Sequence, residues 1–109
     1  MFVEDIIESI EKIETYISKL DYDEFSSSSK TIDAVVRNLE IIGEASRNIP
    51  TAIRTKHSEI QWKRMIGLRN IVSHQYFGID LKIIWQITTK NLPETKPLIK
   101  KLIEEINTN

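Results

Sequence analysis

The stretch Ser-Lys-Thr-Ile-Asp-Ala-Val-Val-Arg-Asn-Leu-Glu-Ile-Ile-Gly-Glu-Ala-Ser-Arg, residues 29–47, decides the fold of this chain. Its apolar side chains recur at steps of three and four residues, the spacing that places them on one face of an α-helix. Pro50 disfavours helical geometry in the residue before it, so the helix must end near Arg47. The predicted inward positions are Ile32, Val35, Val36, Leu39, Ile42 and Ala45.

Gly43 lies in the middle of this predicted helix. A glycine inside a helix costs about 1 kcal/mol relative to alanine, so its presence there needs a structural reason. We expect a neighbouring helix to approach the backbone closely at this position.

The same helical pattern extends on both sides of residues 29–47. Residues 2–20 carry isoleucines at positions 6, 10, 13 and 17, which predicts an amphipathic first helix. After Pro50, Ser58 and Gln61 have the spacing of a capping box and predict the start of a helix that runs toward Tyr76. Phe77 and Gly78 would end that helix.

The last third of the chain predicts two more helices, one from Leu81 to about Lys90, capped by Asp80, and one that ends near Ile106. The sequence Asn-Leu-Pro at 91–93 predicts a break or kink between them. No strand-like alternation and no internal repeat is found. The sequence therefore predicts an all-α fold: one domain over residues 1–109, built as an antiparallel up-and-down bundle of four to five helices.

Composition narrows the possible function. The 109 residues are 40% hydrophobic and 28% charged, as in ordinary globular domains. No apolar run approaches the ~20 residues of a membrane span, and residues 1–5 lack the basic start of a secretory signal. The chain has no cysteine, and its two histidines lack zinc-type spacing. These features predict a cytoplasmic protein that uses no metal or other cofactor and does not associate with a membrane.

The net charge of −1 argues against a domain that coats nucleic acid through bulk positive charge. The charge is nevertheless uneven. Residues 1–54 hold six Lys and Arg against eleven Asp and Glu, a net of −5, and residues 55–109 hold nine against five, a net of +4. The second half could present a locally basic face, or its lysines and arginines could be ordinary solvated helix surface.

A polar cluster interrupts the apolar pattern of the third helix, with Arg69, Asn70, Ser73, His74 and Tyr76 within about two turns. Arginine is a permanent cation whose forked donors suit phosphate, and histidine can exchange a proton near neutral pH. A cation for developing phosphate charge and a proton shuttle are the minimum needed to cut RNA without a metal. We therefore interpret the cluster as a candidate active site.

Helix geometry leaves the arrangement of this cluster open. On a regular helix Arg69, Ser73 and Tyr76 share one face, whereas Asn70 and His74 share the adjacent one. The step of five between Arg69 and His74 is wide for direct contact, so either the helix loosens toward its end or a substrate bridges the two. The alternative is structural, because cations near a helix end complement the helix dipole and need no catalytic role.

Other chemistry-bearing residues favour structural interpretations. His57 follows Lys56 and is expected to reach solvent. The carboxylates of Glu40 and Glu44 could bind a metal or act as acid and base, but Glu44 is expected to pair with Arg47 or Arg37 instead. The two tryptophans are expected to be core or interface anchors rather than base-stacking platforms; they are Trp62 and Trp85.

The segment 69–76 resembles the R-x4-H-x-Y signature of HepT-like toxins, in the HEPN superfamily of helical nucleotide-binding and ribonuclease domains. The resemblance covers roughly residues 2–105. It includes Asn-Leu-Glu-Ile-Ile-Gly-Glu-Ala at 38–45, Ile-Pro at 49–50, Gly-Leu-Arg-Asn at 67–70, Tyr-Phe-Gly-Ile-Asp at 76–80, and the two tryptophans.

The resemblance implies a homodimer of helical protomers whose two motifs face a shared cleft. It also implies a metal-independent endoribonuclease that acts on RNA and not DNA, and that serves as the toxin beside a minimal nucleotidyltransferase antitoxin. Arg69 and His74 would then be catalytic, with Asn70 and Ser73 in support. Tyr76 would accept AMP from the antitoxin.

Two rival classes stay open on the residues alone. The chain could be a non-catalytic helical module that binds a nucleotide or a nucleotidyltransferase. It could also be a purely structural dimer in which the polar cluster is an interface network. RNA cleavage separates the enzyme from both.

Overall fold

The computed structural model describes residues 2–73 and 80–108, with Val72 and Ser73 described as backbone only. Every element in these residues is helical, so the predicted all-α class is confirmed. His74 and Tyr76, and the helix stop predicted at Phe77 and Gly78, lie outside the described residues. The elements are α1 (Phe2–Ile17), α2 (Tyr22–Ser26), α3 (Ser29–Arg47), α4 (Thr51–Lys56), α5 (Trp62–Ser73), α6 (Leu81–Gln86), the π-helical turn η2 (Ile87–Asn91) and α7 (Leu92–Thr108).

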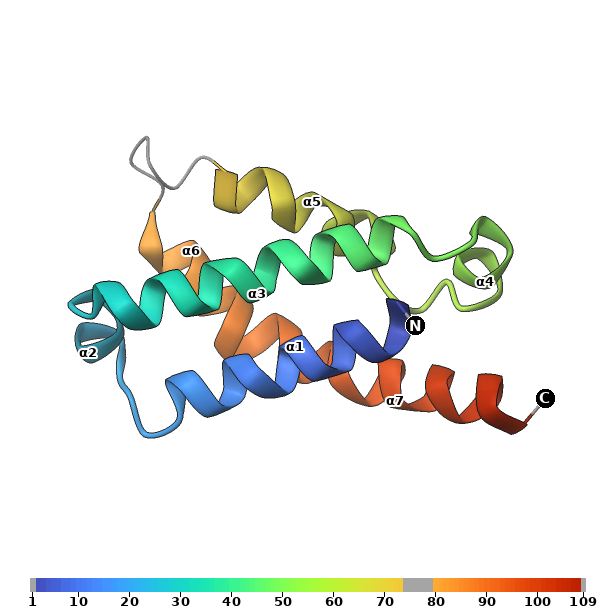
Figure 1. The fold of residues 1–109 in the computed structure, drawn as a ribbon, viewed down its shortest axis with the longest axis horizontal. Coiled ribbons are helices and arrows are strands. Elements are labelled where there is room, and N and C mark those ends of the chain that lie inside the picture. The colour runs from blue at the N-terminus through green and yellow to red at the C-terminus, as the bar shows by residue number, and fades with distance from the viewer. Residues whose placement is uncertain (1, 74–79, 109) are drawn as a thin grey trace.

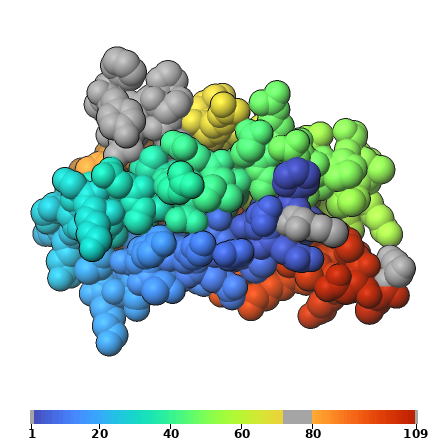
Figure 2. Space-filling model, in the orientation of Figure 1, coloured from blue at the N-terminus to red at the C-terminus, as the bar shows by residue number. Residues whose placement is uncertain are grey.

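Helix α3 is the centre of the bundle. It packs against α1 on one side and α5 on the other, and α7 packs against α1. Successive long helices run in opposite directions, which confirms the predicted up-and-down arrangement (Figure 1). Figure 2 shows α1 and α3 in continuous contact across one face of the molecule. All six positions predicted to face inward from residues 29–47 are buried.

The core is mainly aliphatic, with Phe25 and Trp62 as its aromatic members, and is supplied by every long helix. Its most enclosed side chains include Ile6, Ile10 and Ile13 of α1, Leu39 and Ile42 of α3, and Ile99 and Leu102 of α7. Burial of such side chains is the main favourable term in folding. All four long helices therefore share one core, to which α5 contributes Trp62, Met65 and Leu68.

Two short helices were not predicted. The first helix ends at Ile17, three residues earlier than expected, and the chain turns through Lys19 with a φ of 67°. Asp21 and Glu24 then cap the N-terminus of α2 in a reciprocal capping box. Helix α4 begins directly after Pro50.

The capping box predicted at Ser58 is wrong. Helix α5 begins at Trp62, and its first backbone hydrogen bond runs from Met65 N–H to the carbonyl of Gln61. Residues 57–60 instead form a turn in which Ile60 N–H donates to the His57 carbonyl over 3.1 Å. That carbonyl also accepts from the Trp62 indole N–H, at 3.1 Å, so the side chain of the first residue of α5 closes this turn.

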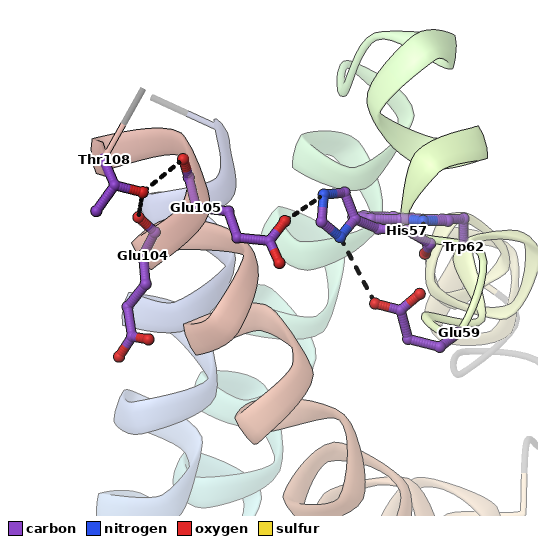
Figure 3. Close-up of polar contacts among 6 residues, drawn as sticks. All are labelled: His57, Glu59, Trp62, Glu104, Glu105 and Thr108. Atoms are coloured by element: carbon purple, nitrogen blue, oxygen red, sulfur yellow. Dashed lines mark hydrogen bonds and ion pairs between the residues drawn. The ribbon is translucent and has the colours of Figure 1, made fainter.

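The expectation that His57 reaches solvent is also wrong, because the residue is only 7% exposed. Its ring lies between two carboxylates: Nε2 is 3.1 Å from Glu105 Oε2, and Nδ1 is 3.6 Å from Glu59 Oε1 (Figure 3). Glu105 belongs to the last turns of α7, so this contact ties the turn before α5 to the C-terminal end of the bundle.

The kink predicted at 91–93 takes the form of η2. The N–H of Leu92 donates to the Ile87 carbonyl, five residues back, which widens the helix by one residue before Pro93. The chain changes direction between α6 and α7 at this turn (Figure 1).

Further along α7, Lys96 Nζ lies 2.7 Å from Glu14 Oε1 of α1. This hydrogen bond raises the pKa of Lys96 above its ordinary value although burial acts in the opposite direction.

Within the described residues, no helix has both the length and the apolar character needed to cross a membrane.

Candidate active site

Arg69 lies on the last turns of α5 and points its guanidinium at α3. Its Nη1 is 3.0 Å from Oε2 of Glu44, and both side chains are more than half exposed. Glu44 therefore does not pair with Arg47 or Arg37 as predicted from local spacing. The ion pair joins two neighbouring helices across 25 residues of sequence.

The close approach predicted at Gly43 is confirmed, and its partner is Arg69 itself. A Cβ built on Gly43 would lie 3.1 Å from the backbone nitrogen of Arg69, 3.3 Å from its Cβ and 3.4 Å from the Ile66 carbonyl oxygen. The missing side chain thus lets α5 touch α3 at the candidate catalytic arginine. Leu68, the residue before Arg69, is buried and holds the same turn against the core.

Substituting Gly43 by alanine tests whether this contact positions Arg69. Alanine favours the helix by about 1 kcal/mol, but its Cβ must push α5 by a few tenths of an ångström. Because sub-ångström placement controls catalysis, we expect stability to change little and RNA cleavage to fall by about 3- to 10-fold. Thermal unfolding and initial cleavage rates measure the two effects.

Gly67 supplies the matched control on α5. A Cβ built there meets nothing within 4 Å, so Gly67→Ala gains helix propensity without moving a helix. It should raise stability by about 1 kcal/mol and leave the cleavage rate unchanged. If both alanines had the same effect on cleavage, the contact at Gly43 would have no special role.

A shallow hollow lies beside the ion pair, between α3 and α5. Its volume is about 300 Å³, and its α3 side is built from residues three and four apart on one helical face. It combines two guanidinium and two carboxylate groups with one aliphatic side chain. The lining residues are Arg37, Glu40, Ile41, Glu44 and Arg69.

A second, larger cleft of about 460 Å³ lies between α5 and the helices that follow it in the chain. Its floor is largely apolar and includes Met65, Leu68 and Ile71 of α5 and Leu98 of α7. Arg69 does not line this cleft; among the described residues of the candidate site, it lines the hollow on the α3 side.

Of the predicted site residues, the structure describes Arg69 and Asn70 in full and Ser73 by its backbone alone. Arg69 and Asn70 are adjacent on α5 and exposed. Ser73 is the last residue of α5, and its side chain is not among those described. The structure brings Arg69 together with Glu44, whose expected ion-pair partners were Arg47 or Arg37. The signal that could have found this contact is the glycine directly before Glu44.

The tryptophans occupy the structural roles predicted for them. Trp62 is buried beneath the turn before α5. Trp85 packs its ring against Phe25, with centroids 5.1 Å apart, and forms a T-shaped contact with the ring of Tyr22. These contacts anchor α6 and α2 to the core.

The model of the family described as ribonuclease HepT-like matches residues 6–102 of this chain. The chain belongs to the ribonuclease HepT-like family. The predicted resemblance is thus confirmed, and family membership places the protein among RNA nucleases.

Known relatives share much of the sequence. The protein named "Probable ribonuclease HepT" of Thermococcus cleftensis is 41% identical over 101 residues, 93% of this chain and 92% of that protein. "Putative RNase MJ1380" of Methanocaldococcus jannaschii is 44% identical over 95 residues, 87% of each chain. From the same organism, "Gamma-glutamylcyclotransferase and putative RNase MJ0434" is 40% identical over all 109 residues, and the chain spans only 49% of its length. No solved structure matches the chain.

Proposed function

We propose that this protein is a metal-independent endoribonuclease whose chemistry is carried by Arg69 and His74. The observation that carries the proposal is the placement of Arg69. It is an exposed cation, fixed in direction by an ion pair, on a helix pressed against α3 through Gly43. His74 follows five residues later in the R-x4-H-x-Y pattern of the family.

In the proposed reaction, neutral His74 takes the proton from a ribose 2′-hydroxyl. The 2′-oxygen forms a bond to the adjacent phosphorus, and the bond from phosphorus to the 5′-oxygen of the next nucleotide breaks. The guanidinium of Arg69 stabilises the negative charge that grows on the phosphoryl oxygens. The departing 5′-oxygen takes up a proton, which yields a 2′,3′-cyclic phosphate and a 5′-hydroxyl.

The donor set supports a reaction without a metal ion. The chain has no cysteine, and its two histidines lie 17 positions apart, without the spacing of a zinc motif. In the part of the chain that the structure describes, no three His, Asp or Glu side chains gather in a way that could hold a metal. The cation that the proposed site supplies is the guanidinium of Arg69, whose forked N–H donors suit the oxygens of a phosphate.

The proposal extends to the assembly and the regulation of the protein, and here its support is the family pattern. Two copies would form a homodimer that brings both motifs to one cleft. The enzyme would act in the cytoplasm as the toxin of a toxin–antitoxin pair. A minimal nucleotidyltransferase would silence it by adding AMP to Tyr76, with Asn70 and Ser73 supporting the unmodified site.

Incubation of the purified protein with RNA in the presence of EDTA tests this function. We expect cleavage that EDTA does not inhibit, with cyclic phosphate ends detectable by mass spectrometry. An oligonucleotide with a single 2′-deoxyribose on the 5′ side of the cleavage point should resist cutting there, because the attacking hydroxyl is absent.

Two results would contradict the proposal. Cleavage that disappears with EDTA and returns with a divalent cation would point to a metal-dependent reaction. No cleavage by folded, unmodified protein would favour the alternative, a module that binds a nucleotide or a nucleotidyltransferase without cutting RNA.

A further inference from the structure

The carboxylate of Glu44 is the one group in the described structure that holds the guanidinium of Arg69 through an ion pair. Glu44 Oε2 lies 3.0 Å from Arg69 Nη1. The other oxygen, Oε1, is 3.4 Å from the amide nitrogen of Asn48, which also donates to the Glu44 backbone carbonyl over 2.8 Å. Glu44 is therefore itself held one turn before the end of α3.

The stability of the fold does not explain this ion pair. The side chain of Arg69 is 59% exposed and that of Glu44 is 52% exposed. Exposed ion pairs contribute little to folding, because water screens the charges and two long side chains lose freedom. The ion pair of Glu44 with Arg69 therefore contributes little to folding stability. Because it holds the candidate catalytic arginine, it points to a role of Glu44 in the site.

Two opposite effects on catalysis follow from the geometry. A free arginine side chain samples many rotamers, and fixing one arm of its planar fork directs the remaining N–H groups. Preorganisation of this kind acts on the transition state and raises kcat. The negative charge of Glu44 also repels an RNA phosphate that approaches Arg69, which raises KM.

We propose that Glu44 is a positioning residue of the ribonuclease site. It orients the side chain of Arg69, and its negative charge weakens the binding of RNA. The inference rests on the function proposed above. It assigns to a carboxylate on α3, outside the R-x4-H-x-Y segment, a role in setting the balance between binding and turnover. The close contact at Gly43 fixes the backbone of Arg69, and Glu44 fixes its side chain.

Steady-state kinetics of Glu44→Ala and Glu44→Gln test the proposal. Alanine removes both the acceptor and the charge, so kcat should fall by about 10-fold or more while KM decreases. Glutamine keeps an acceptor oxygen without the charge, so it should restore kcat to within about 3-fold of wild type and retain the lower KM. A merely structural role of Glu44 would not produce this split or this rescue.

The matched control is the ion pair of Glu8 with Lys12 on α1. Its Nζ–Oε1 distance is 3.2 Å, and the Glu8 side chain is 64% exposed. Glu8→Ala and Glu8→Gln make the same changes in net charge far along the chain from the site. They should leave kcat and KM unchanged, which separates the effect at Glu44 from general charge effects.

A second measurement does not depend on activity. Heteronuclear NOE values of the Arg69 Nε–H group, from NMR of the full chain, report how rigidly the side chain is held. The group should be ordered in the wild type, more mobile in Glu44→Ala, and intermediate in Glu44→Gln.

The outcomes are distinguishable from failure of the proposed function. Suppose that the wild type cuts RNA and that Arg69→Ala cuts none. If Glu44→Ala then keeps the wild-type kcat, the positioning role of Glu44 is overturned and the ribonuclease function stands. If the wild type does not cut RNA, the proposed function fails, and the NMR comparison alone decides whether Glu44 orders Arg69. Equal mobility of Arg69 in wild type and Glu44→Ala would overturn the positioning role in either case.

Discussion

Replacing His74 by alanine is expected to lower RNA cleavage by about 10²- to 10⁴-fold, the contribution of a positioned general base. The alanine variant keeps Arg69 and the contacts of α5 with α3, so the cation remains while the proton acceptor is lost. Initial rates on a fluorescent RNA, measured in EDTA for wild type and variant, give the effect directly.

Controls are needed because a variant can lose activity by losing its fold. Circular dichroism, thermal unfolding and size-exclusion chromatography should give the same results for both proteins. The other histidine cannot serve as a simple control, because His57 is buried between two carboxylates and its removal would disturb the turn before α5. A His74→Ala protein that unfolds, or one that cleaves at the wild-type rate, would argue against the catalytic assignment.

Incubation with the cognate nucleotidyltransferase and ATP is expected to increase the mass of the protein by one or more AMP units and to abolish RNA cleavage. The spacing of seven between Arg69 and Tyr76 would place both on one face of a regular helix. An AMP on the tyrosine would then bring a phosphodiester toward the cation that RNA needs and would block access by its bulk. Tyr76→Phe should escape modification and keep its activity.

The chain provides a matched control for the acceptor. Tyr16, on α1, is 39% exposed and far from the motif in sequence. Tyr16→Phe should be modified and silenced like the wild type, whereas Tyr22 packs against Trp85 and is only partly accessible. A mass increase that persists in Tyr76→Phe would show that the acceptor is another residue.

The long helices could be predicted because each repeats its apolar residues over several turns. The two short helices could not, since α2 has five residues and α4 has six, too few for a complete apolar period. The error at Ser58 has a different cause. The local capping pattern is present, but the Trp62 indole bonds to the His57 carbonyl and the chain turns there instead.

At the candidate site, features within one segment could be predicted from the sequence, whereas contacts between residues far apart in the chain could not. The spacing of Arg69 and His74 is visible in the sequence, because it lies within one segment. The pairing of Glu44 with Arg69 was missed because sequence spacing predicts contacts only between residues three or four apart on one helix. Burial of His57 was missed because its partner Glu105 is 48 positions away and nothing in the local pattern links them.

The contact of His57 with Glu105 gives the C-terminal end of the chain an influence on the site helix. Helix α5 packs against the core and meets α3 closely at Gly43, and the turn that precedes it contacts the final turns of α7 through His57 and Glu105. A truncation, a fusion or a bound protein at the end of α7 would act on that contact. Such a change would reach the start of α5 through the contact of His57 with Glu105, at a place that touches neither Arg69 nor its immediate neighbours.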